Sequence, residues 1–380
     1  MTEQPVLVEE IPATGGKSIG IATLNVERTL NSLSLEMIDL LTAKLEAWQE
    51  DNNLVMVILQ GAGDRAFCAG GDIQDLYRSM AENPGGPNEY ADRFFEHEYR
   101  LDYLIHTYTK PILVWANGVV MGGGLGVMAG CSHRIGTETS RIAMPEITIG
   151  LFPDAGATWF LTRMPTHLAH FLAWTGSHLN AVDAKKVDLI DRLIDFASKD
   201  DVKTALTKAK WGSNSADNKK IVDHVLDNFE CSAEQFPVSQ LDVHEDTIES
   251  MVMHALASDS PVEAFAEQLD KLEFGNDKWL KRAVQTFKGG SPTTAHLIKE
   301  QIDRARGLSL KETLMLELVM AIQCSRHHDF AEGVRALLID KDNSPQWKYT
   351  HVSEVPRHWI ESHFAPPWEG QNPLSNLNDQ

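Results

Sequence analysis

Two adjacent glycines between a strand and a helix constrain the fold more than any other feature of this sequence. The apolar run Leu54–Leu59 is predicted to be a buried strand, and Arg65-Ala-Phe-Cys-Ala-Gly-Gly-Asp-Ile73 follows it. Gly70 and Gly71 would let another atom approach the main chain closely. Unpaired amides at the helix predicted from Asp72 favour negative charge. The junction is predicted to be either half of an oxyanion hole or a tight connecting turn.

A second stretch repeats this design. An apolar strand over 111–116 ends at Asn117-Gly118, three glycines follow, and a helix of small residues is predicted to begin near Gly123. Two such junctions in one domain could aim two amides at one carbonyl oxygen. Loss of one oxyanion donor typically costs about 2.7–4 kcal/mol of barrier, so two aimed amides would carry much of a reaction.

The first 200 residues alternate strand and helix, which predicts an α/β protein with a parallel, helix-covered sheet. Residues 1–15 are interpreted as a loose lead-in, 18–25 as a strand and 88–108 as a helix. Ser34 is predicted to cap a helix over 33–49. Its apolar stripe consists of Met37, Leu40, Leu41, Leu45 and Trp48.

The rest of the chain is predicted to be mostly helical. We expect residues 199–239, which are polar and charged, to form an exposed helical insert, and residues 366–380 to fray. The other predicted helices cover 166–176, 181–196, 261–272, 278–287, 293–307 and 310–327. This pattern predicts a core over 1–200 and a helical region over 201–380 that completes the fold.

Composition excludes several classes of protein. The net charge of −20 argues against nucleic-acid binding, which needs a basic surface. No apolar run reaches the roughly 18 residues of a membrane helix. The start is acidic and lacks arginine, unlike a secretory signal or transit peptide. Four widely spaced cysteines show no metal-ligand spacing and suit a reducing cytoplasm.

Both glycine junctions, together with Met144-Pro-Glu-Ile-Thr-Ile-Gly-Leu-Phe-Pro-Asp154, resemble the crotonase (enoyl-CoA hydratase/isomerase) superfamily. The nearest resemblance is to its 3-hydroxyisobutyryl-CoA hydrolase branch. It covers about residues 17–200 and resumes at Gly290-Ser-Pro-Thr-Thr and at Asp329-Phe-Ala-Glu-Gly-Val-Arg-Ala-Leu-Leu-Ile-Asp-Lys-Asp342. The resemblance implies a crotonase (ClpP-like) spiral of ββα repeats, which the pattern alone does not distinguish from a doubly wound sheet.

The resemblance also implies roles for individual residues. The amides of Gly71 and Gly123 would form the oxyanion hole for an acyl-CoA thioester, and Glu146 falls on the catalytic glutamate. By itself, a glutamate after proline is usually an ordinary helix-start acid. Asp154, otherwise a candidate helix cap, falls on the aspartate that binds the substrate hydroxyl or the attacking water. Glu98, otherwise a solvated helix acid, falls on a substrate-contacting position.

Gly126 is the informative departure within the superfamily. Enoyl-CoA hydratases carry a second catalytic glutamate at this position, and hydration needs two carboxylates. The hydrolase branch has glycine here, so Gly126 favours the hydrolase.

A polyanionic coenzyme A would be repelled by this acidic chain unless a local basic patch compensates. Arg65, just before the first glycine pair, is the candidate for substrate binding. The alternative interpretation is a solvated loop charge.

The sequence therefore predicts a cytoplasmic acyl-CoA thioester hydrolase acting on 3-hydroxyisobutyryl-CoA or a close relative, a step in valine breakdown. Whether Glu146 attacks the thioester or activates water is left open. No metal or redox cofactor is expected; partners would be the acyl-CoA and, as in many family members, further copies of the chain. Neither nucleic acid nor a membrane is expected as a partner.

Three other functions stay open. An enoyl-CoA hydratase or isomerase is one, although Gly126 speaks against hydration. A non-catalytic acyl-CoA-binding protein would not need Glu146 and Asp154 together. A dinucleotide-binding oxidoreductase is the third, because Gly124-Leu-Gly-Val-Met-Ala129 partly matches the fingerprint for that cofactor.

Overall fold

The computed structural model describes residues 4–378. The chain forms two compact units that are interleaved along the sequence. The first contains residues 1–71, 101–142 and 179–239, and the second contains residues 72–100, 143–178 and 240–380. Neither unit is a continuous segment. The expected boundary between domains near residue 200 stays a prediction.

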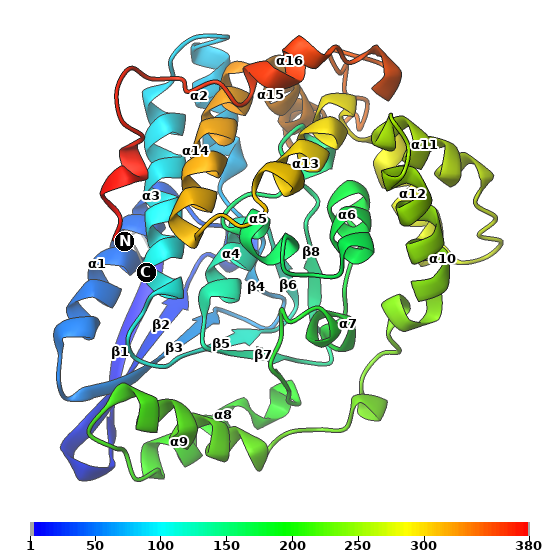
Figure 1. Cartoon of the computed structure of the whole chain (residues 1–380). Coiled ribbons are helices and arrows are strands. Elements are labelled where there is room, and N and C mark those ends of the chain that lie inside the picture. The colour runs from blue at the N-terminus through cyan, green and yellow to red at the C-terminus, as the bar shows by residue number, and fades with distance from the viewer. Residues whose placement is uncertain (1–3, 379–380) are drawn as a thin grey trace. The chain divides into compact units, whose positions relative to one another are not determined.

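A mixed six-stranded sheet organises the first unit. Its order is β1-β2-β3-β5-β7-β9, in which β1 is antiparallel to β2 and the other neighbours are parallel (Figure 1). The strands are β1 (Val6–Ala13), β2 (Lys17–Leu24), β3 (Leu54–Gly61), β5 (Ile112–Ala116), β7 (His133–Gly136) and β9 (Arg192–Leu193). A second, three-stranded sheet has the order β4-β6-β8, formed by β4 (Ala66–Cys68), β6 (Val119–Met121) and β8 (Arg141–Ala143).

Helices follow the strands of the first unit, as the sequence predicts. They are α1 (Leu35–Glu50), α4 (Gly123–Gly130), α7 (Ala181–Lys186), α8 (Lys199–Lys208) and α9 (Ser215–Asp227). The Ser34 hydroxyl caps α1 by accepting from the Met37 amide, which confirms the predicted start. Of the predicted stripe, only Leu40 is exposed. Helix α1 lies close to β2, because a Cβ on Gly20 would lie 2.8 Å from the Trp48 indole.

The second unit is almost entirely helical. Its helices are α2 (Ile73–Glu82), the first part of α3 (Glu89–His106), α5 (Ala157–Leu161), α6 (Thr166–Thr175), α10 (Gln240–Leu256), α11 (Pro261–Lys271), α12 (Lys278–Gly289), α13 (Pro292–Arg304), α14 (Leu310–Arg326), α15 (His328–Val334) and α16 (Arg357–Ser362). Most of the predicted helices are found within a few residues of their expected bounds. None of the described helices is long and apolar enough to cross a membrane.

The predicted lead-in over 1–15 is wrong for its described part. Val6–Ala13 forms β1, an edge strand whose Leu7 and Val8 are exposed. An edge strand pairs through its main chain on one side only, so it tolerates the glutamates and the proline that obscured it in the sequence. Residues 1–3 of this segment lie outside the described residues.

The predicted helix over 181–196 is also wrong in its second half. Helix α7 ends at Lys186, and Asp188 takes a left-handed φ of 57° that no helix continues. The following apolar residues reach the sheet through β9 instead. Leu189, Ile190, Leu193 and Ile194 are buried there.

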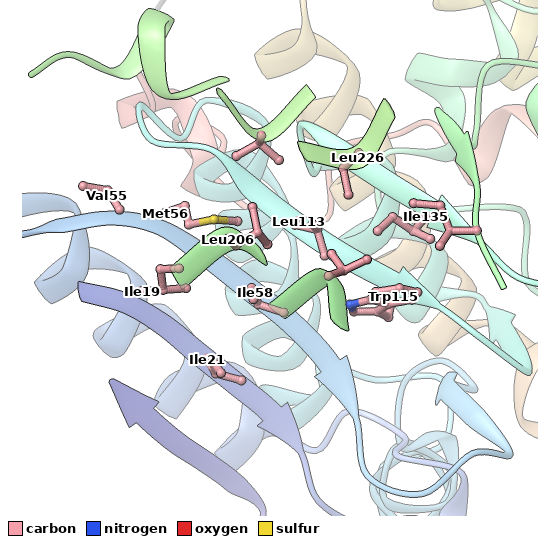
Figure 2. Packing of buried hydrophobic residues seen from close by; sticks show 13 residues of the cluster. Ile19, Ile21, Val55, Met56, Ile58, Leu113, Trp115, Ile135, Leu206 and Leu226 are labelled. Carbon is pink, nitrogen blue, oxygen red and sulfur yellow. The ribbon is translucent and has the colours of Figure 1, made fainter. Parts of the chain in front are cut away.

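The segment 199–239 is helical as predicted, but it is not an exposed insert. Helices α8 and α9 cover one face of the six-stranded sheet with Val202, Leu206, Val222 and Leu226. These side chains join a buried cluster that Figure 2 shows. Its strand residues are Ile19, Ile21, Val55, Met56, Ile58, Leu113, Trp115 and Ile135. Only one narrow side of each helix is apolar, so the average composition of the segment resembles that of an exposed helix.

The predicted fraying of the tail is contradicted up to residue 378. Leu374 is fully buried, the Asn372 side-chain amide donates to the Met315 carbonyl, and Arg100 donates to the Pro373 carbonyl. Residues 379–380 lie outside the described residues.

Replacing Leu206 by alanine tests whether α8 is part of the core. The Leu206→Ala change removes a fully buried side chain and should lower the free energy of unfolding by about 2–5 kcal/mol. Urea unfolding followed by circular dichroism measures it. Thr204→Ala, at an exposed position of the same helix, is the control and should change stability by less than about 0.5 kcal/mol. Equal effects of the two substitutions would contradict the packing of α8.

Candidate active site

The two glycine junctions pack directly against each other within the first unit. A Cβ on Gly124 would lie 2.4 Å from the Cys68 carbonyl oxygen, and one on Gly70 would lie 3.8 Å from the Gly123 amide nitrogen. Gly70 and Gly122 have left-handed φ values of 111° and 49°. Only glycine allows this approach and this backbone, so the repeated glycine pattern has a steric cause.

One predicted donor begins a helix, and the other lies just before one. Gly123 is the first residue of α4, and the N–H groups of a first helical turn have no acceptor inside the helix. Gly71 precedes Asp72, which caps α2 by accepting from the amides of Gln74 and Asp75. Outside regular elements, the main-chain hydrogen bonds of the described residues include none donated by Gly71 or Gly123. Both amides suit a negatively charged oxygen.

A buried asparagine that the sequence analysis missed supports the first junction. Asn31 is fully buried with a φ of 57°, and its side-chain amide donates to the carbonyls of Ala62 and Ala66. Beside it, the Leu30 carbonyl accepts from Ala69 and the Leu33 amide donates to Gly70. Asparagine tolerates a left-handed backbone, but no periodic signal in the sequence marks this role.

Arg65 has an exposed side chain at the start of the same loop. Its carbonyl accepts from the Val119 amide, and a Cβ on Gly118 would lie 2.1 Å from that oxygen. The structure therefore fixes the main chain of Arg65 and leaves its side chain on the surface, where it can meet an anion.

Three predicted acids, Glu98, Glu146 and Asp154, are buried in the second unit. Their exposed fractions are 3%, 4% and 7%, respectively. Glu146 begins the short helical turn Glu146–Ile149, and Glu98 lies in α3. One carboxyl oxygen of Glu98 and one of Glu146 have no hydrogen-bond partner among the described residues. Buried polar atoms normally have partners, so these oxygens are suited to a ligand.

Burial raises the pKa values of all three acids, and repulsion adds to the rise for Glu98 and Glu146. Burial, then the charge of Asp154, raises the pKa of Glu146 well above its usual value. Burial, then the charges of Asp154 and Glu317, does the same for the pKa of Glu98. Burial raises the pKa of Asp154 to about 6, although a hydrogen bond from the Tyr99 hydroxyl opposes this rise. That hydroxyl lies 2.7 Å from Oδ2. A carboxyl with a pKa near neutrality, such as Asp154, can exchange protons with a substrate.

Three of the segments that carried the resemblance, 144–154, 290–294 and 329–342, meet in this unit. The Ser291 hydroxyl donates to Asp329 over 2.6 Å, and the Ser291 amide donates to the Ile147 carbonyl. A Cβ on Gly150 would lie 2.4 Å from the Asp329 carbonyl oxygen. Residues 290–294 and 329–334 thus fix the turn between Glu146 and Asp154.

Gly126 and the partial dinucleotide motif both lie inside α4. A dinucleotide fingerprint needs its glycines in the turn before the helix, and Gly124–Ala129 here follows the start of the helix. Gly126 is buried and brings no side chain to this position. Neither feature supplies a second carboxylate or a phosphate loop.

Known proteins resemble this chain in sequence and in fold. A sequence model of the family described as enoyl-CoA hydratase/isomerase matches residues 19–364. The chain belongs to the enoyl-CoA hydratase/isomerase family. This membership confirms the predicted superfamily, and two solved structures of similar fold confirm the predicted α/β crotonase fold with a helical C-terminal region.

Relatives of the chain within this family include two vertebrate proteins named 3-hydroxyisobutyryl-CoA hydrolase, mitochondrial. The Danio rerio protein is 37% identical over 360 residues, which cover 95% of this chain and 89% of the relative. The Homo sapiens protein is 31% identical over 364 residues, which cover 96% and 90%, respectively.

Two solved structures share the fold, and their names give activities other than hydrolysis. A carnitinyl-CoA dehydratase from Mycobacterium thermoresistibile matches with a TM-score of 0.83 and 31% identity, covering 98% of this chain and 100% of that one. An enoyl-CoA hydratase from Rhodobacter sphaeroides 2.4.1 matches with a TM-score of 0.81 and 29% identity, covering 96% and 98%.

Removing the Tyr99 hydroxyl should raise the pKa of Asp154. The Tyr99→Phe change deletes a hydrogen bond that favours the charged carboxylate, so the pKa should move upward by on the order of one unit from about 6. Titration of ¹³C-labelled aspartate carboxyls by NMR measures it. Tyr108→Phe is the matched control, because that hydroxyl donates to the Leu45 carbonyl. A downward shift in Tyr99→Phe would contradict the assigned cause.

Proposed function

We propose that this chain is an acyl-CoA thioester hydrolase that converts 3-hydroxyisobutyryl-CoA to 3-hydroxyisobutyrate and free coenzyme A. The observation that carries the proposal is the pairing of two buried acids, Glu146 and Asp154, whose charges interact, while Gly126 supplies no second glutamate. The names of the Danio rerio and Homo sapiens relatives support this substrate.

In the proposed reaction, the amides of Gly71 and Gly123 donate to the thioester oxygen as it becomes negatively charged. Glu146 acts as a carboxylate, either attacking the carbonyl carbon to form an anhydride or taking a proton from the attacking water. The carbon–sulfur bond breaks, and the coenzyme A sulfur leaves as a thiol, its proton supplied by water. In the anhydride route, a water molecule then cleaves the anhydride, which releases the acid and frees Glu146. Asp154 binds the substrate hydroxyl or the water, and Glu98 contacts the substrate. The expected reach of Glu146 to the two amides stays a prediction.

A second candidate is an enoyl-CoA hydratase. The activity names of the solved structures that share the fold favour it. Hydration needs one carboxylate to activate water and another to protonate the α-carbon. Gly126 opposes this candidate.

We further propose that no metal or redox cofactor takes part and that the protein acts in the cytoplasm, although its Danio rerio and Homo sapiens relatives are named mitochondrial. Assembly into a homo-oligomer is part of the same proposal.

Thioester hydrolysis is tested by mixing the protein with 3-hydroxyisobutyryl-CoA, EDTA and a thiol reagent. Wild type should release thiol, whereas Glu146→Ala and Asp154→Asn should each lose about 10²–10⁴-fold in kcat, because proton transfer and attack depend on these carboxylates. Glu36→Ala, at an exposed position of α1, is the control and should keep full activity. A fully active Glu146→Ala would overturn its catalytic role. A wild type that instead hydrates crotonyl-CoA and releases no thiol would establish the second candidate.

The proposed role of Arg65 predicts a change in KM rather than kcat. Arg65→Gln should raise the KM for the acyl-CoA roughly 3- to 10-fold, because an exposed ion pair contributes only modest binding free energy. The effect should shrink in high salt, which screens exposed charges. Lys208→Gln, an exposed cation on α8, is the control. An unchanged KM in Arg65→Gln would leave Arg65 as an ordinary solvated charge.

A further inference from the structure

The turn that carries Asp154 has an unusual backbone. Ala155 takes a φ of 55° and Gly156 a φ of 83°, so two consecutive residues are left-handed. Glycine accepts this conformation readily, but alanine does not. A turn of this kind persists only when its surroundings hold it.

Glu317, in the middle of α14, supplies that support. Its side chain is fully buried, and its two carboxyl oxygens accept from two amides of the turn. Oε2 lies 2.7 Å from the Gly156 nitrogen, and Oε1 lies 2.8 Å from the Thr158 nitrogen. Both oxygens of one carboxyl are thereby used on the main chain just after Asp154.

Gln301 on α13 holds the same turn from its other end. Its side-chain amide donates to the Pro153 carbonyl and to the Thr158 hydroxyl, each over 2.5 Å. The Asp154 carbonyl accepts from the Ala157 amide inside the turn. Asp154 therefore lies between two anchored residues, Pro153 and Gly156, and its carboxyl is further held by Tyr99.

Holding this turn with a buried acid is unfavourable in free energy, because burial disfavours the charged form of the carboxyl. Burial raises the pKa of Glu317 to about 8, and the charge of Asp154 adds to the rise. The charge of Glu317 in turn raises the pKa values of Glu98 and Tyr99. A neutral residue would avoid the repulsion, but only a carboxyl group can accept from two amides with two oxygens.

We propose that Glu317 is a positioning residue, which fixes the direction of the Asp154 carboxyl by clamping the amides of Gly156 and Thr158. This inference rests on the proposed function, in which Asp154 binds the substrate hydroxyl or the water. Glu317 itself touches no substrate.

A double-mutant cycle with Asp154 tests the proposal. In the wild-type background, Glu317→Gln loses one acceptor and should lower kcat for thiol release about 10-fold, and Glu317→Ala should lower it about 100-fold, because small displacements of reacting groups are costly. In the Asp154→Asn background, the same changes should cost less than about 3-fold, because residues that act together are not additive.

Glu312→Gln is the matched control for these substitutions. Glu312 lies at the exposed start of α14, where its side chain accepts from the Ser309 amide, and glutamine can fill this capping role. We expect unchanged kcat in both backgrounds.

Hydrogen exchange gives a readout that does not depend on activity. In Glu317→Gln, the peptide covering residues 154–160 should exchange faster than in wild type, while peptides from α10 and α11 stay unchanged. The folded state of the variant is verified in the same experiment.

Several outcomes would overturn the proposal. Equal costs of the Glu317 changes in both backgrounds would show a role independent of Asp154, and unchanged kcat or unchanged exchange would show that no clamp exists. A fully active Asp154→Asn would show that the reaction does not depend on the Asp154 carboxyl, so that its positioning would have no effect. A wild type that releases no thiol would overturn the proposed function itself, which separates that failure from the failure of the clamp.

Discussion

The contact between Gly124 and the carbonyl of Cys68 is the constraint on which the candidate site depends. It lets two strand–helix junctions lie closer together than any pair of side chains would permit. Main-chain groups are held in place by the sheet and by Asn31, so they need little reordering when charge develops near them. Gly70, Gly122 and Gly124 are required sterically, and their direct neighbours Gly71 and Gly123 are the proposed donors, so adjacent residues serve folding and the proposed chemistry.

The second unit gathers acids where a stable core would normally place apolar groups. Glu98, Glu146, Asp154 and Glu317 are all buried, and their pKa values are all raised. Such burial lowers stability as the pH rises above the unfolded-state pKa values of about 4, because the unfolded acids then lose protons that the folded acids retain. The hydrogen bonds from Tyr99, Gly156 and Thr158 offset part of this cost. The buried acids thus lower the stability of the folded state, which is typical of a reactive site.

The sequence was sufficient to predict the glycine junctions, most helices and the acids that a family motif marks. These features depend on local patterns: apolar periodicity for α1, capping by Ser34, and paired glycines where backbones meet. It was not sufficient for β1 and β9, whose short or edge strands have weak patterns of their own. Asn31, Tyr99 and Glu317 escaped notice because their roles depend on partners between 31 and 161 residues away in the chain. The roles of the predicted site residues remain predictions.

The interleaving of the two units has a consequence for how the molecule is made on the ribosome. The last segment of the first unit ends at Ser239, so that unit has all its residues well before synthesis finishes. The second unit starts at Asp72 but remains incomplete until α14, residues 310–326, has been synthesised. Until Glu317 emerges, the left-handed backbone at Ala155 lacks its support, so the nascent chain carries Asp154 on an unfinished turn.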